Sequence, residues 1–243
     1  MSDPTCIELD DVVAGYGELV ILNHLSLRAG RGKITLLIGP NGAGKSTALK
    51  TLFGMLPVRH GRIRLDGHDI TGCAPRALLT RHGVAYVPQG RNLFGQLSVY
   101  ENLELGGITL GMKTTRERIP EVLARFPRVK DRLHSAAASL SGGEQKQLEV
   151  GRALLLRPRV VLIDEPSVGL SPLLVSQTIT KIGELKERVG LTVLMAEQNF
   201  NQAIRIADRG YIIVHGEIAV AARSVDELKA NDIVKRLYLG GVV

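Results

Sequence analysis

The sequence predicts an α/β fold in which a mostly parallel sheet presents a phosphate-binding site at its carboxyl edge. A glycine-rich run at residues 39–47 lies between an apolar stretch and an amphipathic stretch. A second apolar stretch, 160–163, ends in two acidic residues, and residues 98–157 show helical patterns with no convincing strand. Strands that alternate with helices and end in such residues are typical of α/β proteins that bind phosphates.

The glycine-rich run matches the pattern G-x-x-x-x-G-K-[ST]. Its members are Gly39, Pro40, Asn41, Gly42, Ala43, Gly44, Lys45, Ser46 and Thr47. The preceding residues, 34–38, are apolar and rich in β-branched side chains, as in a buried parallel strand. The apolar residues that follow recur at spacings of three and four, which indicates the core-facing side of a helix.

A loop between such a strand and helix wraps a phosphate chain with backbone N–H groups, and the helix N-terminus adds partial positive charge. We expect Lys45 to reach the β- and γ-phosphates and the Ser46 hydroxyl to coordinate Mg²⁺. The alternative is a glycine-rich turn with an accidental lysine, and the flanking strand and helix argue against it. The sequence therefore predicts a protein that binds a nucleoside triphosphate.

Antiparallel strands are predicted in the first thirty residues, because apolar and polar side chains alternate over 7–10 and again over 25–27. Between them Tyr16 stands between two glycines in an expected loop, exposed enough to stack on a flat ring. Taken alone, such a residue is more often an ordinary turn aromatic. Its place ahead of the phosphate loop makes Tyr16 a candidate platform for adenine.

Two more strands are predicted after the first helix. Residues 62–65 run into the tight turn Asp66-Gly67, and residues 84–87 end at Pro88-Gln89-Gly90. The carboxyl end of a strand is the edge at which open α/β sheets bind ligands. Gln89 is therefore a candidate contact to Mg²⁺ or its water, although a loop glutamine alone is more often simply solvated.

Helices are predicted between 98 and 157. Ser98 and Glu101 have the spacing of a capping box, 116–126 forms a second helix, and Ser141 and Glu144 repeat the capping spacing. Gly142 and Gly143 leave the first N–H groups of the third helix uncovered, which predicts a second anion site on a separate helical subdomain. An ordinary helix start explains the cap but not the two glycines, which lower helix stability.

The apolar stretch 160–163 predicts a buried strand that delivers two carboxylates to the same edge of the sheet. We expect Asp164 to bind Mg²⁺, directly or through water. Glu165 stands one residue beyond the strand and is a candidate to polarise the water that attacks the γ-phosphate. Adjacent acids at a strand end are often mere surface, but the upstream phosphate loop favours the functional interpretation.

The rest of the chain continues the alternation. We expect a helix over 175–189, a strand over 191–195 and a closing hairpin over 211–220. Glu197-Gln198-Asn199 again lie at a strand's carboxyl end, and a last helix capped at Ser224 is expected to end near Tyr238. The six histidines show no metal-ligand spacing.

Composition narrows the class of protein. The apolar runs are far shorter than the roughly 20 residues that cross a bilayer, and the N-terminal residues do not resemble a signal peptide. We therefore expect a cytoplasmic protein unless a partner holds it at a membrane. The net charge of +7 suggests nucleic acid or anionic lipid, but the basic residues are scattered and few aromatics are present to stack bases. No nucleic-acid partner is expected.

These motifs, in this order, resemble the ATP-binding cassette (ABC) family over essentially the whole chain. Residues 39–47 resemble its Walker A loop, Tyr16 its A-loop aromatic and Gln89 its Q-loop glutamine. The run 140–145, LSGGEQ, resembles the family signature, with Glu144 inserted before the glutamine. Asp164 and Glu165 resemble the Walker B aspartate and the catalytic glutamate.

The resemblance implies a single ABC nucleotide-binding domain over 1–243 that binds ATP and Mg²⁺. Residues 1–90 and 158–243 would form a P-loop NTPase (RecA-like) core with an antiparallel β subdomain. Residues 91–157 would form an inserted helical subdomain that carries the signature.

Two positions depart from the family pattern. Ser171 stands where the D-loop aspartate is usual, and Gln198 stands where the switch histidine is usual. A glutamine can hydrogen-bond a γ-phosphate oxygen through its amide, but it cannot carry charge. Because both departures are similar to the ATPase subunits of branched-chain amino acid importers, we interpret them as a habit of that subfamily. Glu165, Gln198 and Lys45 are the expected catalytic residues.

The resemblance also implies a head-to-tail dimer, with ATP between Lys45 of one subunit and Ser141-Gly142-Gly143 of the other. The implied partners are a second ABC ATPase subunit, identical or homologous, two integral-membrane permeases and, indirectly, a periplasmic or extracellular substrate-binding protein. The implied location is the cytoplasmic face of the membrane, and the implied function is ATP-driven import of branched-chain amino acids. Import of urea, amides or other amino acids, a soluble ABC ATPase acting on DNA or ribosomes, and a slow nucleotide-binding regulator remain alternatives.

Overall fold

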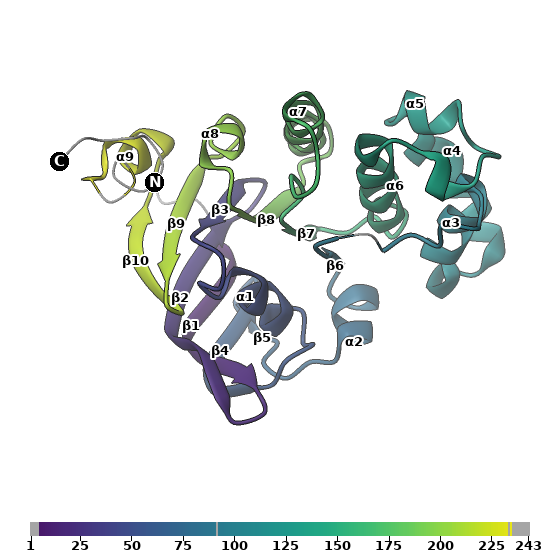
Figure 1. Cartoon of the computed structure of the whole chain (residues 1–243). Coiled ribbons are helices and arrows are strands. Elements are labelled where there is room, and N and C mark those ends of the chain that lie inside the picture. Colours follow the sequence, from purple (N-terminus) through teal and green to yellow (C-terminus); the bar gives the residue numbers. More distant parts are fainter. Residues whose placement is uncertain (1–4, 91, 233, 235–243) are drawn as a thin grey trace.

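The computed structural model describes residues 5–90, 92–232 and 234, and it contains two β-sheets with helices between and around them (Figure 1). The strands are β1 Thr5–Tyr16, β2 Leu19–Gly30, β3 Ile34–Ile38, β4 Val58–Leu65, β5 His68–Asp69, β6 Val84–Val87, β7 Val160–Asp164, β8 Thr192–Glu197, β9 Arg209–Val214 and β10 Glu217–Ala222. The α-helices are α1 Lys45–Leu52, α2 Pro75–Thr80, α3 Val99–Gly106, α4 Met112–Leu123, α5 Pro127–Lys130, α6 Gly142–Leu154, α7 Pro172–Val189, α8 Phe200–Ala203 and α9 Val225–Ala230.

The central sheet has the strand order β10-β9-β3-β8-β7-β6. The strands from β9 to β6 are parallel, and β10 joins β9 as an antiparallel hairpin. Every residue of β3 and β7 is buried, because both faces of the sheet are covered. Leu36 belongs to the core shared with α6 and α7, whereas its neighbour Leu37 belongs to the core shared with α1. The predicted α/β fold is confirmed.

The helix that follows the phosphate loop, α1, lies between the two sheets (Figure 1). It contacts β7 and β8 of the parallel sheet and β1 and β2 of the antiparallel sheet. Leu49 and Leu52 are buried in a core that also contains Leu37 of β3 and Leu25 of β2. The loop is therefore held from both sides by packed strands.

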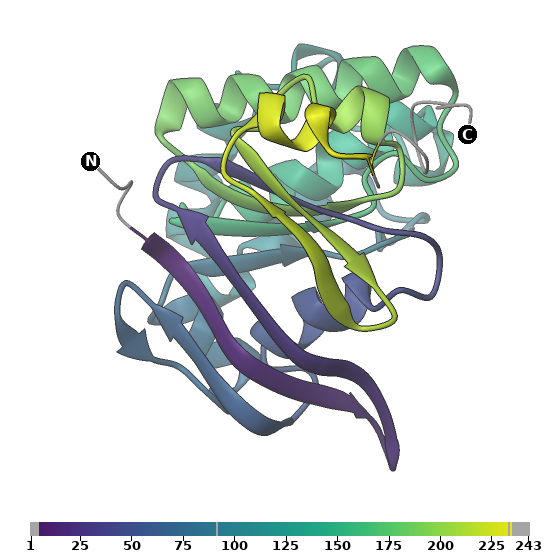
Figure 2. The ribbon, with the colours of Figure 1, turned by 90° about the vertical axis from the view of Figure 1, so that its left-hand side faces the viewer.

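The antiparallel sheet has the order β2-β1-β4-β5, and its long strands lie side by side in Figure 2. The antiparallel strands predicted in the first thirty residues and the tight turn predicted at residues 66–67 are present. One detail differs from expectation: Tyr16 is the last residue of β1 instead of a loop residue. Backbone pairing with Leu19 extends the strand through it.

Residues 99–154 contain helices and no strand of either sheet, as the sequence predicts. The capping boxes at Ser98 and Ser141 are both present. Helix α4 begins at Met112 and ends at Leu123, earlier than the predicted 116–126. Gly111, with φ of 81°, separates it from the preceding turn, and Phe126 has a non-helical backbone before Pro127, which disfavours helix at that position.

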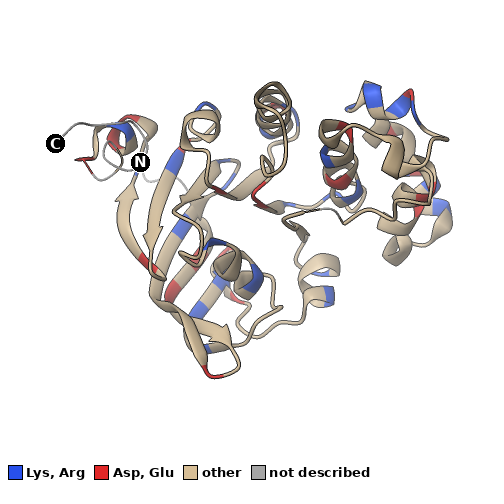
Figure 3. Cartoon of the chain, viewed as in Figure 1, with Lys and Arg blue, Asp and Glu red and all other residues tan. Residues whose placement is uncertain are grey.

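The last predicted helix begins after Ser224, whose hydroxyl accepts the Glu227 N–H, and α9 spans Val225–Ala230. Its predicted end near Tyr238 lies outside the described residues. Of the helices that are described, none combines the length and the apolar character needed to cross a bilayer. Lysine and arginine are distributed over both sheets and several helices (Figure 3).

Candidate functional site

Four parallel strands end at one edge of the central sheet and carry the predicted site residues. Ile38 of β3 lies opposite Glu197 of β8, and Asp164 of β7 lies opposite Ala196. Val87 of β6 lies opposite Ile163. This shared register brings the segments after β3, β6, β7 and β8 together, although they are separated by up to about 160 residues in the sequence.

A cavity of about 490 Å³ opens at this edge. It is lined by Ile21, Asn41, Gly42, Gly44, Lys45, Ser46, Thr47, Gln89, Glu165, Val168 and Gln198. The phosphate loop, Gln89, Glu165 and Gln198 were all predicted from the sequence, and the fold places them around one space.

Glycines shape the phosphate loop where other residues would not fit. A Cβ atom at Gly39 would lie 2.3 Å from the carbonyl oxygen of Ile213. Gly44 is the N-cap of α1 with φ of 107°, a conformation that L side chains rarely adopt. No side chain caps this helix, so side chains leave its first N–H groups available to an anion.

The Lys45 side chain folds back toward the start of the phosphate loop. Its ammonium donates to the carbonyl oxygens of Gly39 at 2.8 Å and Pro40 at 3.0 Å. It also lies 3.1 Å from Oε1 of Glu165, and both side chains are almost completely buried. The other oxygen of Glu165 accepts a hydrogen bond from Gln89 Nε2 at 2.9 Å. Glu165 is thus held on both oxygens, and its backbone φ of 44° turns the chain sharply after β7.

Ser46 and Asp164 meet beside this pair. The Ser46 hydroxyl donates to Oδ1 of Asp164 at 2.9 Å, and the Tyr86 hydroxyl donates to Oδ2 at 3.0 Å. Burial raises the pKa of Asp164 despite these two hydrogen bonds, which favour the carboxylate. Burial and the neighbouring Asp164 also raise the pKa of Tyr86.

The donor set at this point fits a magnesium ion. Mg²⁺ prefers oxygen ligands and usually takes one or two carboxylates, with water and phosphate oxygens completing the shell. Ser46 and Asp164 supply a hydroxyl and a buried carboxylate within hydrogen-bonding distance of each other. A cation there would favour the ionised form of Asp164, which burial alone disfavours.

Gln198 lines the cavity from the end of β8, and its side chain is exposed. The residue before it, Glu197, was not assigned a role from the sequence. Its carboxylate is fully buried and accepts hydrogen bonds from Ser167 N and Oγ, from Gln198 N and from Asn199 N. Burial raises the pKa of Glu197. Through these hydrogen bonds Glu197 connects the segment after β7 to the segment after β8. In the sequence, its position at the end of a strand is the one feature that could have indicated a role.

Three predicted groups do not line the cavity, and one of them, Asp164, still contacts the lining residue Ser46 through a hydrogen bond. The other two are Tyr16 and the signature. Tyr16 is 45% exposed at the end of β1, and Lys50 of α1 donates to its hydroxyl at 3.4 Å. The signature residues Ser141, Gly142, Gly143 and Glu144 lie at the start of α6 and are also absent from the cavity lining. Within one chain the signature therefore does not share the cavity of the phosphate loop.

The glycines at the start of α6 lie close to two leucine side chains. A Cβ atom at Gly142 would lie 2.8 Å from Leu170 Cδ2, and one at Gly143 would lie 2.8 Å from Leu174 Cδ2. The carboxylate of Glu144 accepts hydrogen bonds from the Ser141 N–H and hydroxyl. Partial burial opposes the effect of these bonds, but the net result is a lowered pKa for Glu144.

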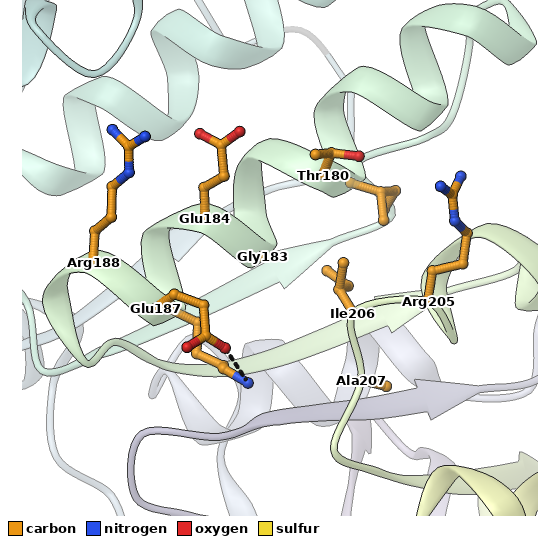
Figure 4. Close-up of a pocket in the computed structure, with 10 residues that line it drawn as sticks. Thr180, Gly183, Glu184, Glu187, Arg188, Arg205, Ile206 and Ala207 are labelled. Carbon is orange, nitrogen blue, oxygen red and sulfur yellow. Dashed lines mark ion pairs between the residues drawn. The ribbon is translucent and has the colours of Figure 1, made fainter.

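A second hollow, of about 550 Å³, lies between α7 and the segment that follows α8 (Figure 4). Its lining includes Gly183, Glu187 and Ile206 and none of the predicted site residues. Lys186 pairs with Glu187 at 2.9 Å, shown by the dashed line in Figure 4. The smaller cavity at the sheet edge is the candidate site, because residues of the phosphate loop line it together with Gln89, Glu165 and Gln198.

Comparison with known proteins gives consistent matches. Residues 22–168 match the family model described as ABC transporter. The chain is 40% identical to the high-affinity branched-chain amino acid transport ATP-binding protein BraG of Pseudomonas aeruginosa, over 97% of this chain and 100% of the relative. It is 36% identical to the probable branched-chain amino acid transport ATP-binding protein LivF of Archaeoglobus fulgidus, over 93% of this chain and 95% of the relative.

Two further matches bear on the interpretation. The lipopolysaccharide export system ATP-binding protein LptB of Haemophilus influenzae is 33% identical, over 95% of each chain. A crystal structure of the ADP conformation of an ATP-binding cassette of an ABC transporter is 28% identical, with a TM-score of 0.86 over 98% of this chain and 99% of that one.

Proposed function

Because the chain belongs to the ABC transporter family and is a nucleotide-binding ATPase, we propose that it energises a membrane importer of branched-chain amino acids. The observation that carries the proposal is the cavity at the sheet edge, which Lys45, Ser46 and Glu165 line, with Asp164 hydrogen-bonded to Ser46 beside it. The full-length similarity to two branched-chain amino acid transport ATP-binding proteins supports the choice of transport system.

In this proposal the residues of the phosphate loop bind the phosphates of ATP. The backbone N–H groups from Gly42 to Ser46 face the phosphate oxygens, and Lys45 exchanges its carbonyl contacts for the β- and γ-phosphates. Glu165 then loses its direct partner and becomes free to orient and polarise the attacking water. Gln198 donates its amide to a γ-phosphate oxygen, and Gln89 keeps Glu165 in place.

Ser46 and Asp164 are the proposed residues that hold magnesium, with Gln89 nearby at the edge of the same cavity. When bound, the ion supplies positive charge that offsets the charge of the phosphates. The hydrogen bond from Tyr86 fixes the orientation of the Asp164 carboxylate.

We further propose that the complete site needs two subunits. The signature residues Ser141, Gly142, Gly143 and Glu144 lie away from the cavity of their own chain, so they are available to the ATP of a partner. In the proposed division, residues 91–157 form the helical subdomain that carries the signature. Residues 1–90 and 158–243 form the core, and Tyr16 stacks on adenine.

The proposed assembly contains a second ABC ATPase subunit, identical or homologous, and two permeases, with a substrate-binding protein outside the membrane. The proposed location is the cytoplasmic face of the membrane, where permeases hold the protein. The similarity to LptB favours one alternative, which is that the same ATPase machinery drives export of lipopolysaccharide.

The experiment that tests this is gentle purification of the protein from detergent-solubilised membranes, followed by identification of the proteins that accompany it. Recovery with two permeases and a binding protein that binds leucine, isoleucine or valine would establish the proposal. A binding protein specific for urea or amides would replace branched-chain amino acids as the proposed substrate. Recovery with components of an export system, or in the soluble fraction with ribosomes or nucleic acid, would overturn it.

A further inference from the structure

Three side chains from three neighbouring strands converge on the outer part of the antiparallel sheet. Asp11 is on β1, His24 on β2 and His60 on β4, and these strands lie side by side in the order β2-β1-β4 (Figure 2). His24 Nδ1 lies 2.7 Å from Oδ1 of Asp11, and His60 Nε2 lies 2.9 Å from Oδ2. All candidate ligand atoms lie within 4.8 Å of one another. From this geometry we propose that Asp11, His24 and His60 bind a divalent transition-metal ion of the Zn²⁺ type.

The ligand types point to that class of ion. Imidazole nitrogen with one carboxylate suits Zn²⁺ and its first-row neighbours, whereas Mg²⁺ and Ca²⁺ prefer oxygen. The two imidazole ring centroids are 5.6 Å apart and the rings are inclined at 64°. Two imidazoles on one tetrahedral zinc ion, with Zn–N bonds of about 2 Å, have centroids roughly 5 Å apart. Three protein ligands leave a coordination position for water.

The backbone supports the same conclusion, because local strain concentrates at the ligands. Asp11 has φ of 58° and His24 has φ of 51°, conformations that cost energy in residues other than glycine. The pairing of β1 is irregular next to Asp11 with both of its neighbours, between Leu9 and Val12 on one side and between Asp10 and Val13 on the other. Bulges of this kind re-aim a side chain.

Strand β4 is adapted to the bulge beside His60. A Cβ atom at Gly61 would lie 2.2 Å from the Asp11 carbonyl oxygen, and Gly61 itself has φ of 84°. The bulge removes the Asp11 N–H from regular strand pairing, and this N–H donates a hydrogen bond to the Ser26 hydroxyl instead. The strands therefore approach closely enough for His60 to reach the carboxylate.

The three side chains are 51–61% exposed, so an ion can enter from solvent. They lie on the antiparallel sheet and none lines the cavity of the phosphate loop. Ion binding there would clip β1, β2 and β4 together without using a residue of the nucleotide site. Because imidazole binds a metal only when it is neutral, acidification should weaken the binding.

The test is a titration of the full-length protein with Zn²⁺, followed by nuclear magnetic resonance of the histidine ring nitrogens. One equivalent should shift the signals of Nδ1 of His24 and Nε2 of His60 together and leave the other four histidines unchanged. Mg²⁺ at the same concentration should shift neither. Zn²⁺ binding that leaves both rings unchanged would overturn the proposal, whether or not the ion binds elsewhere.

Variants provide a second measurement by calorimetry. His24→Asn keeps a residue that tolerates positive φ, and both it and His60→Gln should weaken Zn²⁺ binding at least tenfold. His215→Asn, at another exposed position with φ of 48°, and His68→Gln, on exposed β5, are the matched controls and should bind as the original protein does. Equal affinity in all four variants would contradict the assignment, and the spectra of the unmodified protein decide the matter if a variant fails to fold.

Discussion

The ammonium of Lys45 and the carboxylate of Glu165 form an ion pair at 3.1 Å in which both side chains are almost fully buried. Burying two charges is costly, and the cost is offset here by further hydrogen bonds from Gln89 and to the carbonyls of Gly39 and Pro40. Removal of one partner therefore affects both folding and catalysis. The two effects must be measured separately.

Replacement of Glu165 by glutamine should lower the ATP hydrolysis rate by roughly 100-fold or more, the range expected for loss of a general base. ATP binding should persist, because Lys45 and the phosphate loop, the proposed contacts to the phosphates, are unchanged. Steady-state ATPase activity and equilibrium ATP binding are the measurements. Glu187→Gln, at a side chain that is 74% exposed, is the control. Turnover near the original rate in Glu165→Gln would remove Glu165 from the mechanism.

Asp164→Asn should raise the Mg²⁺ concentration needed for half-maximal hydrolysis, by roughly tenfold or more on the scale of lost metal ligation. The neutral amide keeps the size of the side chain and can still contact Ser46 and Tyr86. ATPase rates over a magnesium titration test this. The control is Asp69→Asn on exposed β5. An unchanged magnesium requirement would show that the ion is held elsewhere.

The two capping boxes of the helical part allow a matched comparison. Ser98→Ala and Ser141→Ala each remove a hydroxyl that accepts the N3 backbone N–H, so each should lower the free energy of unfolding by about 1 kcal/mol. Only Ser141→Ala should also lower ATP hydrolysis, because Ser141 belongs to the signature. Denaturant unfolding and ATPase assays separate the two effects. Equal loss of activity in both variants would make the role of Ser141 structural.

Gly39→Ala and Gly42→Ala separate two reasons for glycine in the phosphate loop. One reason is close packing against a neighbouring strand, and the other is a backbone conformation with positive φ. At position 39 a methyl group would meet backbone 2.3 Å away, so we expect a loss of about 1–3 kcal/mol in the free energy of unfolding. At position 42 no atom lies within 4 Å, and the cost comes only from φ of 77°, about 1 kcal/mol. Urea unfolding of both variants tests whether Gly39→Ala loses more stability than Gly42→Ala. A larger loss at position 42 would contradict the close approach of Ile213.

Glu197→Gln should change how stability depends on pH. Burial raises the pKa of Glu197 above its usual 4.5, so the fold favours the protonated form. The stability gained from that protonation is fully present below the pKa of the unfolded chain and is lost as pH rises through the folded pKa. Glutamine does not titrate, so the variant should gain stability relative to the original protein as pH rises from acid toward neutral.

Unfolding by urea at several pH values measures this difference, with Glu187→Gln as the control. An amide cannot accept all four hydrogen bonds that the Glu197 carboxylate accepts, so their loss offsets part of this gain where Glu197 is ionised. A stability difference that stays constant across the pH range would show that Glu197 does not change its charge on unfolding in that range.

Local patterns predicted most of the fold and most of the cavity lining. The capping boxes at Ser98 and Ser141 depend on residues three apart, and the strand ends at Ile38 and Asp164 are marked by abrupt changes from apolar to polar residues. Such signals are contained in a few neighbouring residues. Parallel strands then bring their ends to one edge, which explains why Gln89, Glu165 and Gln198 could be grouped in advance.

Features that depend on tertiary pairing were not predictable in this way. Glu197 anchors Ser167, thirty residues away, through hydrogen bonds that follow from the register of β7 and β8. His24 and His60 meet at Asp11 only because irregular pairing shifts β1 against two neighbours. The sequence spacing of these histidines does not indicate the irregular pairing, so their meeting could not be predicted from it.

The position of α1 between two sheets has a consequence for the motions of the site. Beyond the uncapped first turn, its amide hydrogens can exchange with solvent deuterium only when packed strands separate, so exchange in the rest of α1 should be among the slowest in the protein. Gln198 and Val168 stand on exposed or half-buried segments that open far more easily. In the proposed site, one wall of the cavity should therefore open readily, and the other should move only when the core opens.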